Sequence, residues 1–301
     1  MSCEFWRDLI GSYQGCAIDY GVLGGYISGS DVGTTGVYRL TFDTETFSIR
    51  SYVLPVLRTI RSSFNSSFKG YWCGGYGGGY RDDIDGLDFV LETIINPAAT
   101  LSSVRYTATG VNSVDKGYSG GGRASGYLNN IEAFVFSSET SSNLAATLVS
   151  ARGYTAGLNS NTRGYWCGGL FPLLAEIDGI RFDTEAAINP AAALSVARYA
   201  AGGFNSTTNG YVAGGGDSPI KSEIDGINFA TETLINPTAN LPTPCYRSCG
   251  FNSLTSGYTQ GSGSGANIYG FNFSTETTYS VSTGATSLSQ DLSACQSGGI
   301  L

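Results

Sequence analysis

The strongest constraint on this chain of 301 residues is an internal repeat with a period of about 47 residues. The hexapeptide GYWCGG illustrates it, because it occurs at 70–75 and again, two periods later, at 164–169. A fixed period of this length is typical of repeat architectures, in which each copy is one supersecondary unit. Adjacent glycines mark five copies and a Gly-Ser pair marks a weaker sixth; these pairs begin at Gly24, Gly74, Gly121, Gly168, Gly214 and Gly261.

Three further anchors keep the same spacing. They are an Asn-Ser dipeptide, a phenylalanine that ends a motif such as IDGLDF, and a glutamate three residues after that phenylalanine. The dipeptides begin at Asn65, Asn112, Asn159, Asn205 and Asn252, and the glutamates are Glu45, Glu92, Glu139, Glu185, Glu232 and Glu276. The agreement of these anchors makes the repeat the frame for every other expectation about the fold.

Each copy predicts four short strands. In residues 198–244 we expect strands at RYAAGGFN, GYVAGG, EIDGINFA and ETLINPTANL, with a polar STTN turn between the first two. Pro237 and Pro242 suit an outer edge strand, where a missing N–H is harmless. One such sheet cannot bury both faces alone, whereas copies packed around an axis can. We therefore expect an all-β, six-bladed β-propeller with four antiparallel strands per blade, and the paired glycines beside its crowded axis.

The repeat also predicts the blade boundaries. A single propeller domain spans 1–301, with a C-terminal tail at 289–301 and blades at about 7–57, 58–104, 105–151, 152–197, 198–244 and 245–288. Ring closure has two candidates: the N-terminal segment GSYQGCAIDY, which we favour slightly, and the tail. Leu288, at the start of LSQDLSACQSGG, is in step with Leu101, Leu148, Leu194 and Leu241.

Several repeated residues resemble those of a known family. A hydrophobic residue or Tyr precedes Gly-Gly, an aromatic residue ends the third strand, and an arginine opens the first strand, as at Arg58, Arg105, Arg152 and Arg198. This pattern resembles the kelch repeats of β-propellers, although INPAA-like sequence replaces the family's tryptophan in strand four. More loosely, the repeats resemble those of virion structural proteins of bacteriophages of the cyanophage type. The resemblances imply a kelch-like propeller and a place on a phage tail or capsid.

Composition excludes several classes of function. The net charge is −8 and no basic run is present, so nucleic-acid binding is not expected. No apolar stretch approaches the ~20 residues of a membrane span, and the N-terminal MSCEFWRDLI lacks the apolar region of a signal peptide. We therefore expect synthesis in the host cytoplasm, without membrane insertion.

The cysteine and histidine counts argue against metal and cofactor chemistry. The chain has seven cysteines without a spacing framework and no histidine. We expect no metal, no cofactor and buried reduced thiols, with Trp and Cys of GYWCGG packed in the core as strand two of blades two and four. Without histidine, Ser-His-Asp machinery is absent and we expect no catalytic residue and no enzyme activity. Two-carboxylate glycoside hydrolysis needs no histidine and stays as an alternative.

The connection between strands two and three varies most among the copies, and these connections share one face of a propeller. Binding residues favour loops held by a rigid scaffold. YGGGYRDD and RASGYLNN supply the candidate ligand-binding residues Tyr76, Tyr80, Arg81, Asp82, Asp83, Arg123 and Tyr127. LFPLLAE supplies the candidate docking residues Leu170, Phe171, Leu173 and Leu174, which either cover the channel or contact another protein. The alternative for the first two loops is a solvated connection with no ligand.

Two constant features are interpreted as structural. The Asn of the Asn-Ser dipeptide is expected to close an Asx-type turn. Asp82, Asp83, Asp85 and Asp88 faintly resemble a calcium loop. However, the aspartate of IDG returns in other copies at Asp178 and Asp225, so Asp85 is better explained by pairing with the arginine that opens its blade.

The functional expectation follows from these points. It is a non-enzymatic bacteriophage virion structural protein on a tail or capsid surface that binds other virion proteins, with a host-surface glycan or receptor as a further candidate partner. Two alternatives stay open: an intracellular kelch-type scaffold for protein interactions, and a carbohydrate-active enzyme that uses the acids near Asp82.

Overall fold

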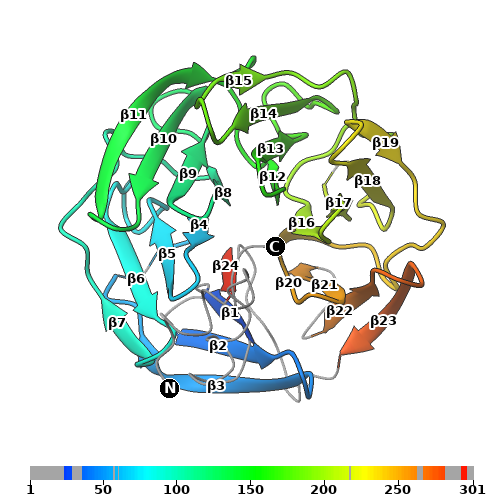
Figure 1. Ribbon diagram of the computed structural model, residues 1–301, viewed down its shortest axis with the longest axis horizontal. Coiled ribbons are helices and arrows are strands. Elements are labelled where there is room, and N and C mark those ends of the chain that lie inside the picture. Colours follow the sequence, from blue (N-terminus) through cyan, green and yellow to red (C-terminus); the bar gives the residue numbers. More distant parts are fainter. Residues whose placement is uncertain are drawn as a thin grey trace, which may run out of the picture.

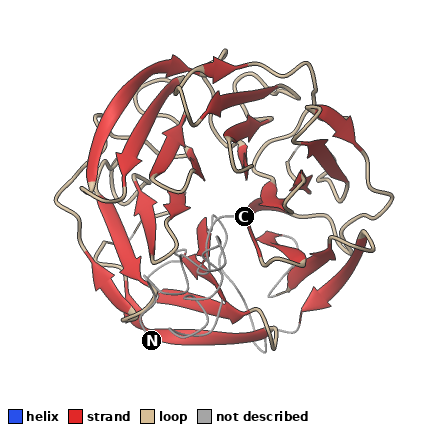
Figure 2. Ribbon diagram, in the orientation of Figure 1, coloured by secondary structure: helices blue, strands red, loops and turns tan. Residues whose placement is uncertain are grey.

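The chain is an all-β propeller with four-stranded antiparallel blades. The computed structural model describes residues 24–28, 36–56, 58–59, 61–216, 218–262, 267–281 and 293–296, and every regular element among them is a strand (Figure 2). Five blades consist of four consecutive strands each. They are formed by β4 (Ser62–Asn65), β5 (Lys69–Cys73), β6 (Ile84–Asp88) and β7 (Thr93–Ile95); β8 (Thr109–Asn112), β9 (Lys116–Gly120), β10 (Asn130–Val135) and β11 (Thr140–Thr147); β12 (Ala156–Asn159), β13 (Arg163–Cys167), β14 (Ile177–Arg181) and β15 (Ala187–Ile188); β16 (Gly202–Asn205), β17 (Asn209–Ala213), β18 (Ile224–Asn228) and β19 (Thr233–Ile235); and β20 (Tyr246–Asn252), β21 (Ser256–Ser262), β22 (Ile268–Asn272) and β23 (Thr277–Val281).

The remaining sheet joins the two ends of the chain. Its order is β24-β1-β2-β3, formed by β24 (Ser293–Gln296), β1 (Gly24–Ser28), β2 (Gly36–Thr41) and β3 (Thr46–Val53). β24 pairs antiparallel with β1, so the C-terminal tail supplies the strand beside β1. The preference for the N-terminal segment as that strand was wrong. Residues 11–20 themselves lie outside the described residues. The tail takes this place by pairing with β1 and contacting the inner strands β20 and β4 of the sheets on either side.

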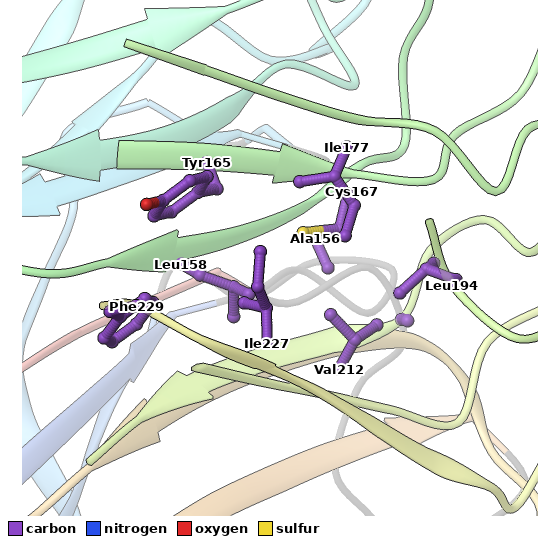
Figure 3. Close-up of a cluster of buried hydrophobic side chains, with 10 residues drawn as sticks. Ala156, Leu158, Tyr165, Cys167, Ile177, Leu194, Val212, Ile227 and Phe229 are labelled. Carbon is purple, nitrogen blue, oxygen red and sulfur yellow. The ribbon is translucent and has the colours of Figure 1, made fainter. Parts of the chain in front are cut away.

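The blades surround a central axis, with β4, β8, β12, β16, β20 and β24 nearest the centre (Figure 1). Each of these inner strands contacts the inner strand of the next sheet, and β24 contacts both β20 and β4. The core lies between adjacent blades rather than within any one of them. Figure 3 shows one such interface, where Leu158 and Cys167 face Val212 and Ile227 of the next blade. This arrangement buries both faces of each sheet, which no single copy could do.

In the five blades from β4–β7 to β20–β23, a tyrosine of the second strand contacts the next blade around the ring. Tyr165 of β13 stacks on Phe229 of the next blade, with ring centroids 5.7 Å apart, and its hydroxyl donates to Glu232 at 3.0 Å (Figure 3). The same contact joins Tyr258 of β21 to Phe42 and Glu45 beside β2. Burial raises the pKa of both tyrosines, so their hydroxyls stay protonated and donate. The Phe and Glu anchors that recur in the repeat therefore serve the contact between blades.

The arginines that open the blades are buried ion-pair partners. Arg58 lies 2.5 Å from Asp85, and Arg198 lies 2.6 Å from Asp225. Both arginines and both aspartates are buried, and each arginine also donates to backbone carbonyls of its own blade. The expected pairing of Asp85 with the arginine that opens its blade is confirmed.

In four of the Asn-Ser dipeptides, at Asn112, Asn159, Asn205 and Asn252, the asparagine side chain joins neighbouring blades, and the expectation of an Asx turn was wrong there. The side-chain oxygen of Asn159 accepts a hydrogen bond from the backbone N–H of Asn112 at 2.7 Å, and that of Asn205 accepts from Asn159 at 2.9 Å. The turn is closed instead by the serine, as at Ser160, whose hydroxyl accepts from the N–H of Arg163 at 3.0 Å. The serine takes the turn because the asparagine reaches the adjacent inner strand.

Four of the glycine pairs, which begin at Gly74, Gly121, Gly168 and Gly214, lie at the exit of strand two, whereas Gly24 and Gly25 begin β1. Their place beside the axis stays a prediction. Gly74 and Gly75 have φ of 63° and 104°, and a Cβ on Gly74 would lie 2.5 Å from the carbonyl oxygen of Arg105, which begins the next blade. The close approach at the axis involves a different glycine, within strand one: a Cβ on Gly203 would lie 2.2 Å from the carbonyl oxygen of Gly157. Both places need glycine because backbones meet there.

The GYWCGG hexapeptides supply β5 and β13, as expected, and their Trp and Cys side chains are buried. Four cysteines whose side chains the structure describes, Cys73, Cys167, Cys245 and Cys249, are free and buried. Burial raises the pKa of Cys167 to about 12, so its thiol stays protonated near neutral pH. The expectation of buried reduced thiols is confirmed for these four residues.

Candidate functional site

One face of the propeller carries all the candidate residues. We call it the loop face: the end of the blades where strand two connects to strand three and where one blade leads to the next. The two kinds of connection are joined by short β-bridges, between Tyr106 and Arg123 and between Gly153 and Leu170. The variable loops are therefore fixed to the connection that enters the same blade, and their side chains are presented by a rigid backbone.

Three tyrosines gather on the loop face between two blades. Tyr76 and Tyr80 come from the β5–β6 loop, and Tyr106 comes from the connection that precedes β8. The rings of Tyr80 and Tyr106 stack with centroids 5.1 Å apart and planes at 6°, and Tyr76 lies 5.8 Å from Tyr80. Tyr76 and Tyr80 are 47% and 38% exposed. The cluster is pre-ordered aromatic surface in contact with solvent.

The aromatic surface continues into the next two blades. Arg123 donates to the hydroxyl of Tyr106 at 3.2 Å, and its guanidinium lies over the ring of Tyr127, 5.4 Å from the centroid. Tyr127 stacks on Phe171 at 4.8 Å, and Phe171 is 57% exposed. These contacts connect six side chains in one band, which we call the aromatic row: Tyr76, Tyr80, Tyr106, Arg123, Tyr127 and Phe171.

The charged residues of the β5–β6 loop hold the loop in shape. Asp83 lies 2.6 Å from Arg58 and 2.8 Å from Arg81. Burial opposes ionisation of Asp83, but the hydrogen bond from Arg81 and the charge of Arg58 outweigh it and lower the pKa of this carboxyl. Arg81 and Asp83 therefore neutralise each other. Asp82 contributes a backbone carbonyl that accepts from the N–H of Leu101 at 2.8 Å.

The acidic stretch that resembles a calcium loop has protein partners for most of its carboxylates. Asp83 and Asp85 both pair with Arg58, and Asp88 accepts from the backbone N–H groups of Val90 and Leu91 at 2.9 Å. Within the part of the chain that the structure describes, no group of three or more Cys, Asp or Glu side chains is placed to hold a metal ion. Asp83, Asp85 and Asp88 therefore act in ion pairs and a turn.

The apolar loop between β13 and β14 divides into an anchored and an exposed half. Leu170 and Leu174 are partly buried, and their N–H groups donate to the carbonyls of Gly153 and Gly169 at 2.9 and 3.0 Å. Phe171 and Leu173 are exposed. Because Phe171 belongs to the aromatic row, the candidate docking loop and the candidate ligand loops form one continuous surface.

The sequence missed Tyr106, which the structure places at the centre of this surface. It directly follows Arg105, where the other copies have Thr59, Gly153, Tyr199 and Tyr246. This variation was a usable signal, because a position that differs among copies does not serve the common geometry. The position lies in the connection that enters the blade, outside the loops between strands two and three that vary most among the copies.

Comparison with known proteins does not assign a family. The sequence matches no protein-family model and no curated protein. Among the described residues, no helix is long and apolar enough to cross a membrane. The resemblance to kelch repeats and to phage virion proteins therefore stays a proposal.

Proposed function

We propose that this chain is a closed, six-bladed kelch-like propeller that acts as a non-catalytic binding module. Support for closure comes from β24, which contacts β4 on one side and β20 on the other. The contact of Tyr258 with Phe42 and Glu45 repeats, between the last and first parts of the chain, the fastening found between consecutive blades. A repeated contact at this place is what a complete ring requires.

The aromatic row is the binding surface, and its ligand is a saccharide of a host-cell surface. The observation that carries this proposal is the pair of nearly parallel rings of Tyr80, which is exposed, and Tyr106, which is half-buried. Exposed aromatic rings stack on the C–H faces of sugar rings while their hydroxyls hydrogen bond to the sugar. Arg123 adds a donor beside them. Because these side chains already contact one another, binding would freeze few rotamers.

The place of this module is the surface of a bacteriophage particle, at the tail or on the capsid, alongside other virion proteins. This part of the proposal rests on the resemblance of the repeats and on a composition poor in charge: 13% of residues are charged, against ~25% in ordinary domains. Phe171 and Leu173, the exposed half of the apolar loop, extend the row toward a protein neighbour.

The test of the binding proposal is a glycan array of bacterial surface saccharides, followed by calorimetry on the best hit. Tyr80→Ala and Phe171→Ala should each weaken binding by ~tenfold, because truncation of a buried aromatic contact typically costs more than 1 kcal/mol. Leu254→Ala is the matched control, since Leu254 is exposed in a turn at the opposite end of the blades. Binding that survives both row substitutions would overturn the assignment of the surface.

Each of the two alternative functions predicts a different experimental result. Immunogold labelling of purified particles should place the protein at a tail or over a capsid, whereas absence from particles together with co-purified host proteins would favour the intracellular scaffold. Hydrolysis of a bound saccharide that is lost in Asp82→Asn or Asp83→Asn would favour the carbohydrate-active enzyme.

A further inference from the structure

Arg123 is a cation within the aromatic row, and its side chain contacts tyrosines. Its guanidinium donates to the hydroxyl of Tyr106 at 3.2 Å and lies 5.4 Å from the ring centroid of Tyr127. Burial raises the pKa of Tyr127, so that hydroxyl stays protonated near neutral pH and does not neutralise the arginine. An arginine side chain keeps its charge in a protein. Among the described residues, no carboxylate forms an ion pair with Arg123.

The acids of the loops that carry the row are engaged elsewhere. These loops, at 74–83, 121–129 and 168–176, contain three acids: Asp82, Asp83 and Glu176. Asp83 and Glu176 each form an ion pair with a buried arginine that opens a blade, at 2.6 and 3.1 Å. Asp82 acts electrostatically on Arg81 in its own loop. The positive charge of Arg123 is therefore not neutralised by the loops around it.

Arginine at this position is also a departure from the repeat. A short β-bridge joins Arg123 to Tyr106. The equivalent bridges of three other blades have uncharged residues at this position: Tyr76, Leu170 and Gly216. The bridge forms even where the residue has no side chain, so the fold does not require a cation here. A role confined to the aromatic row explains the arginine.

The guanidinium of Arg123 can be reached from solvent. The residue is partly exposed, and one of the several N–H groups of its planar head donates to Tyr106. The tips of the first two loops of the row are open, since a Cβ built on Gly79 or Gly126 would meet nothing within 4 Å. A ligand on the row can therefore approach the remaining donors without displacing either tip.

The inference rests on the proposed saccharide binding and narrows its ligand. We propose that the saccharide carries a singly charged oxyanion, a carboxylate or a sulfate ester, which pairs with Arg123 while the sugar ring stacks on the neighbouring tyrosines. One guanidinium balances one negative charge, and its planar fork can donate two parallel hydrogen bonds to a pair of oxygens. The aromatic rings supply contact area, and Arg123 selects acidic over neutral sugars.

The experiment compares charged and neutral sugars on the full chain, by calorimetry and saturation-transfer NMR at constant ionic strength. The probes are glucuronic acid with its methyl ester, and a sulfated galactose with galactose itself. A Kd on the order of 1 mM is expected for the charged sugar, because a monosaccharide has few atoms. Its neutral counterpart should bind ~fivefold to tenfold more weakly, since it lacks the charge-assisted hydrogen bonds. The pair with the larger difference identifies the source of the oxyanion.

Variants assign the preference to Arg123. Arg123→Gln should reduce the preference for the charged sugar to less than ~twofold and leave the affinity for the neutral sugar unchanged, because the rings stay in place. Arg123→Lys keeps the charge without the planar fork and should retain part of the preference. Lys221→Gln is the matched control, because it removes one positive charge from the β17–β18 loop of the same face, outside the row.

The outcomes separate this inference from the proposed function. Equal binding of charged and neutral sugars that is weakened in Tyr80→Ala would overturn the inference and leave the saccharide site in place. A preference that persists in Arg123→Gln, or that falls equally in Lys221→Gln, would also overturn it. Absence of binding by all of these sugars and by the glycan array would overturn the proposed function together with the inference.

Discussion

At the scale of single residues, the copies of the repeat show which side chains depend on one another. In most blades a buried arginine meets a buried carboxylate, as Arg198 meets Asp225. The β20–β23 blade has Cys245 in place of the arginine and Tyr269 in place of the aspartate, and both are buried in an apolar cluster. The two charges are thus lost together. A buried ion pair adds little over an apolar replacement, but half of one is costly.

The first prediction applies this natural replacement to another blade. Arg198→Cys alone leaves Asp225 buried without its cation and should lower the free energy of unfolding by ~3–5 kcal/mol. Asp225→Tyr alone should cost a similar amount. The double variant should be more stable than the sum of the two costs by ~2–3 kcal/mol. Denaturant unfolding measures the cycle. The exposed pair Arg181 and Asp183 serves as control, with a coupling of less than ~1 kcal/mol; equal coupling in both cycles would contradict the argument.

At the scale of strands and turns, the repeat in the sequence predicted where the strands lie. The strands of residues 198–244 are β16–β19, as expected, because alternating apolar residues and turn residues are local signals. The role of each anchor was harder to predict. Asn205 looked like a turn residue, yet its oxygen accepts from Asn159 in the preceding blade. The two partners of such a contact lie one period apart, so a single copy does not show it. Within its own copy, a residue that joins two blades stands beside a turn and is therefore mistaken for a turn residue.

The second prediction separates the two reasons for glycine at the exit of strand two. Gly74 and Gly78 have similar φ, 63° and 74°, but a Cβ would lie 2.5 Å from the carbonyl oxygen of Arg105 at Gly74 and would meet nothing within 4 Å at Gly78. Gly78→Ala should therefore cost only the ~1–2 kcal/mol of a left-handed alanine. Gly74→Ala should cost a further ~1–3 kcal/mol, because the next blade must shift. Comparable unfolding free energies for the two variants would show that close approach is unimportant.

At the scale of the whole molecule, closure of the ring depends on strand pairing between the two ends of the chain. β24 covers the edge of β1 with a register that pairs Gly25 with Gln296 and Ser28 with Ser293. The sequence left this closure open, because the tail carries only the leucine of the repeat and not its Asn-Ser dipeptide. Its pairing depends on the position of the first blade, which the rest of the ring fixes. Local sequence therefore could not select the strand, whereas geometry could.

The third prediction tests that closure. Deletion of residues 289–301 removes β24 and exposes the backbone edge of β1 at the centre of the ring. The contacts of β24 with β4 and β20 are lost at the same time. The Tm should therefore fall by about 10 °C, since each kcal/mol lost is worth ~2–4 °C in a domain of 150–250 residues and somewhat less in a longer chain. An unpaired edge also favours self-association, which light scattering would detect as dimers or larger species.

A synthetic peptide of residues 289–301 should restore both the Tm and the monomer, because it can pair with β1 in trans. A truncated chain that is monomeric with an unchanged Tm would show that the ring is held by its blade interfaces alone, with the strand at the seam dispensable.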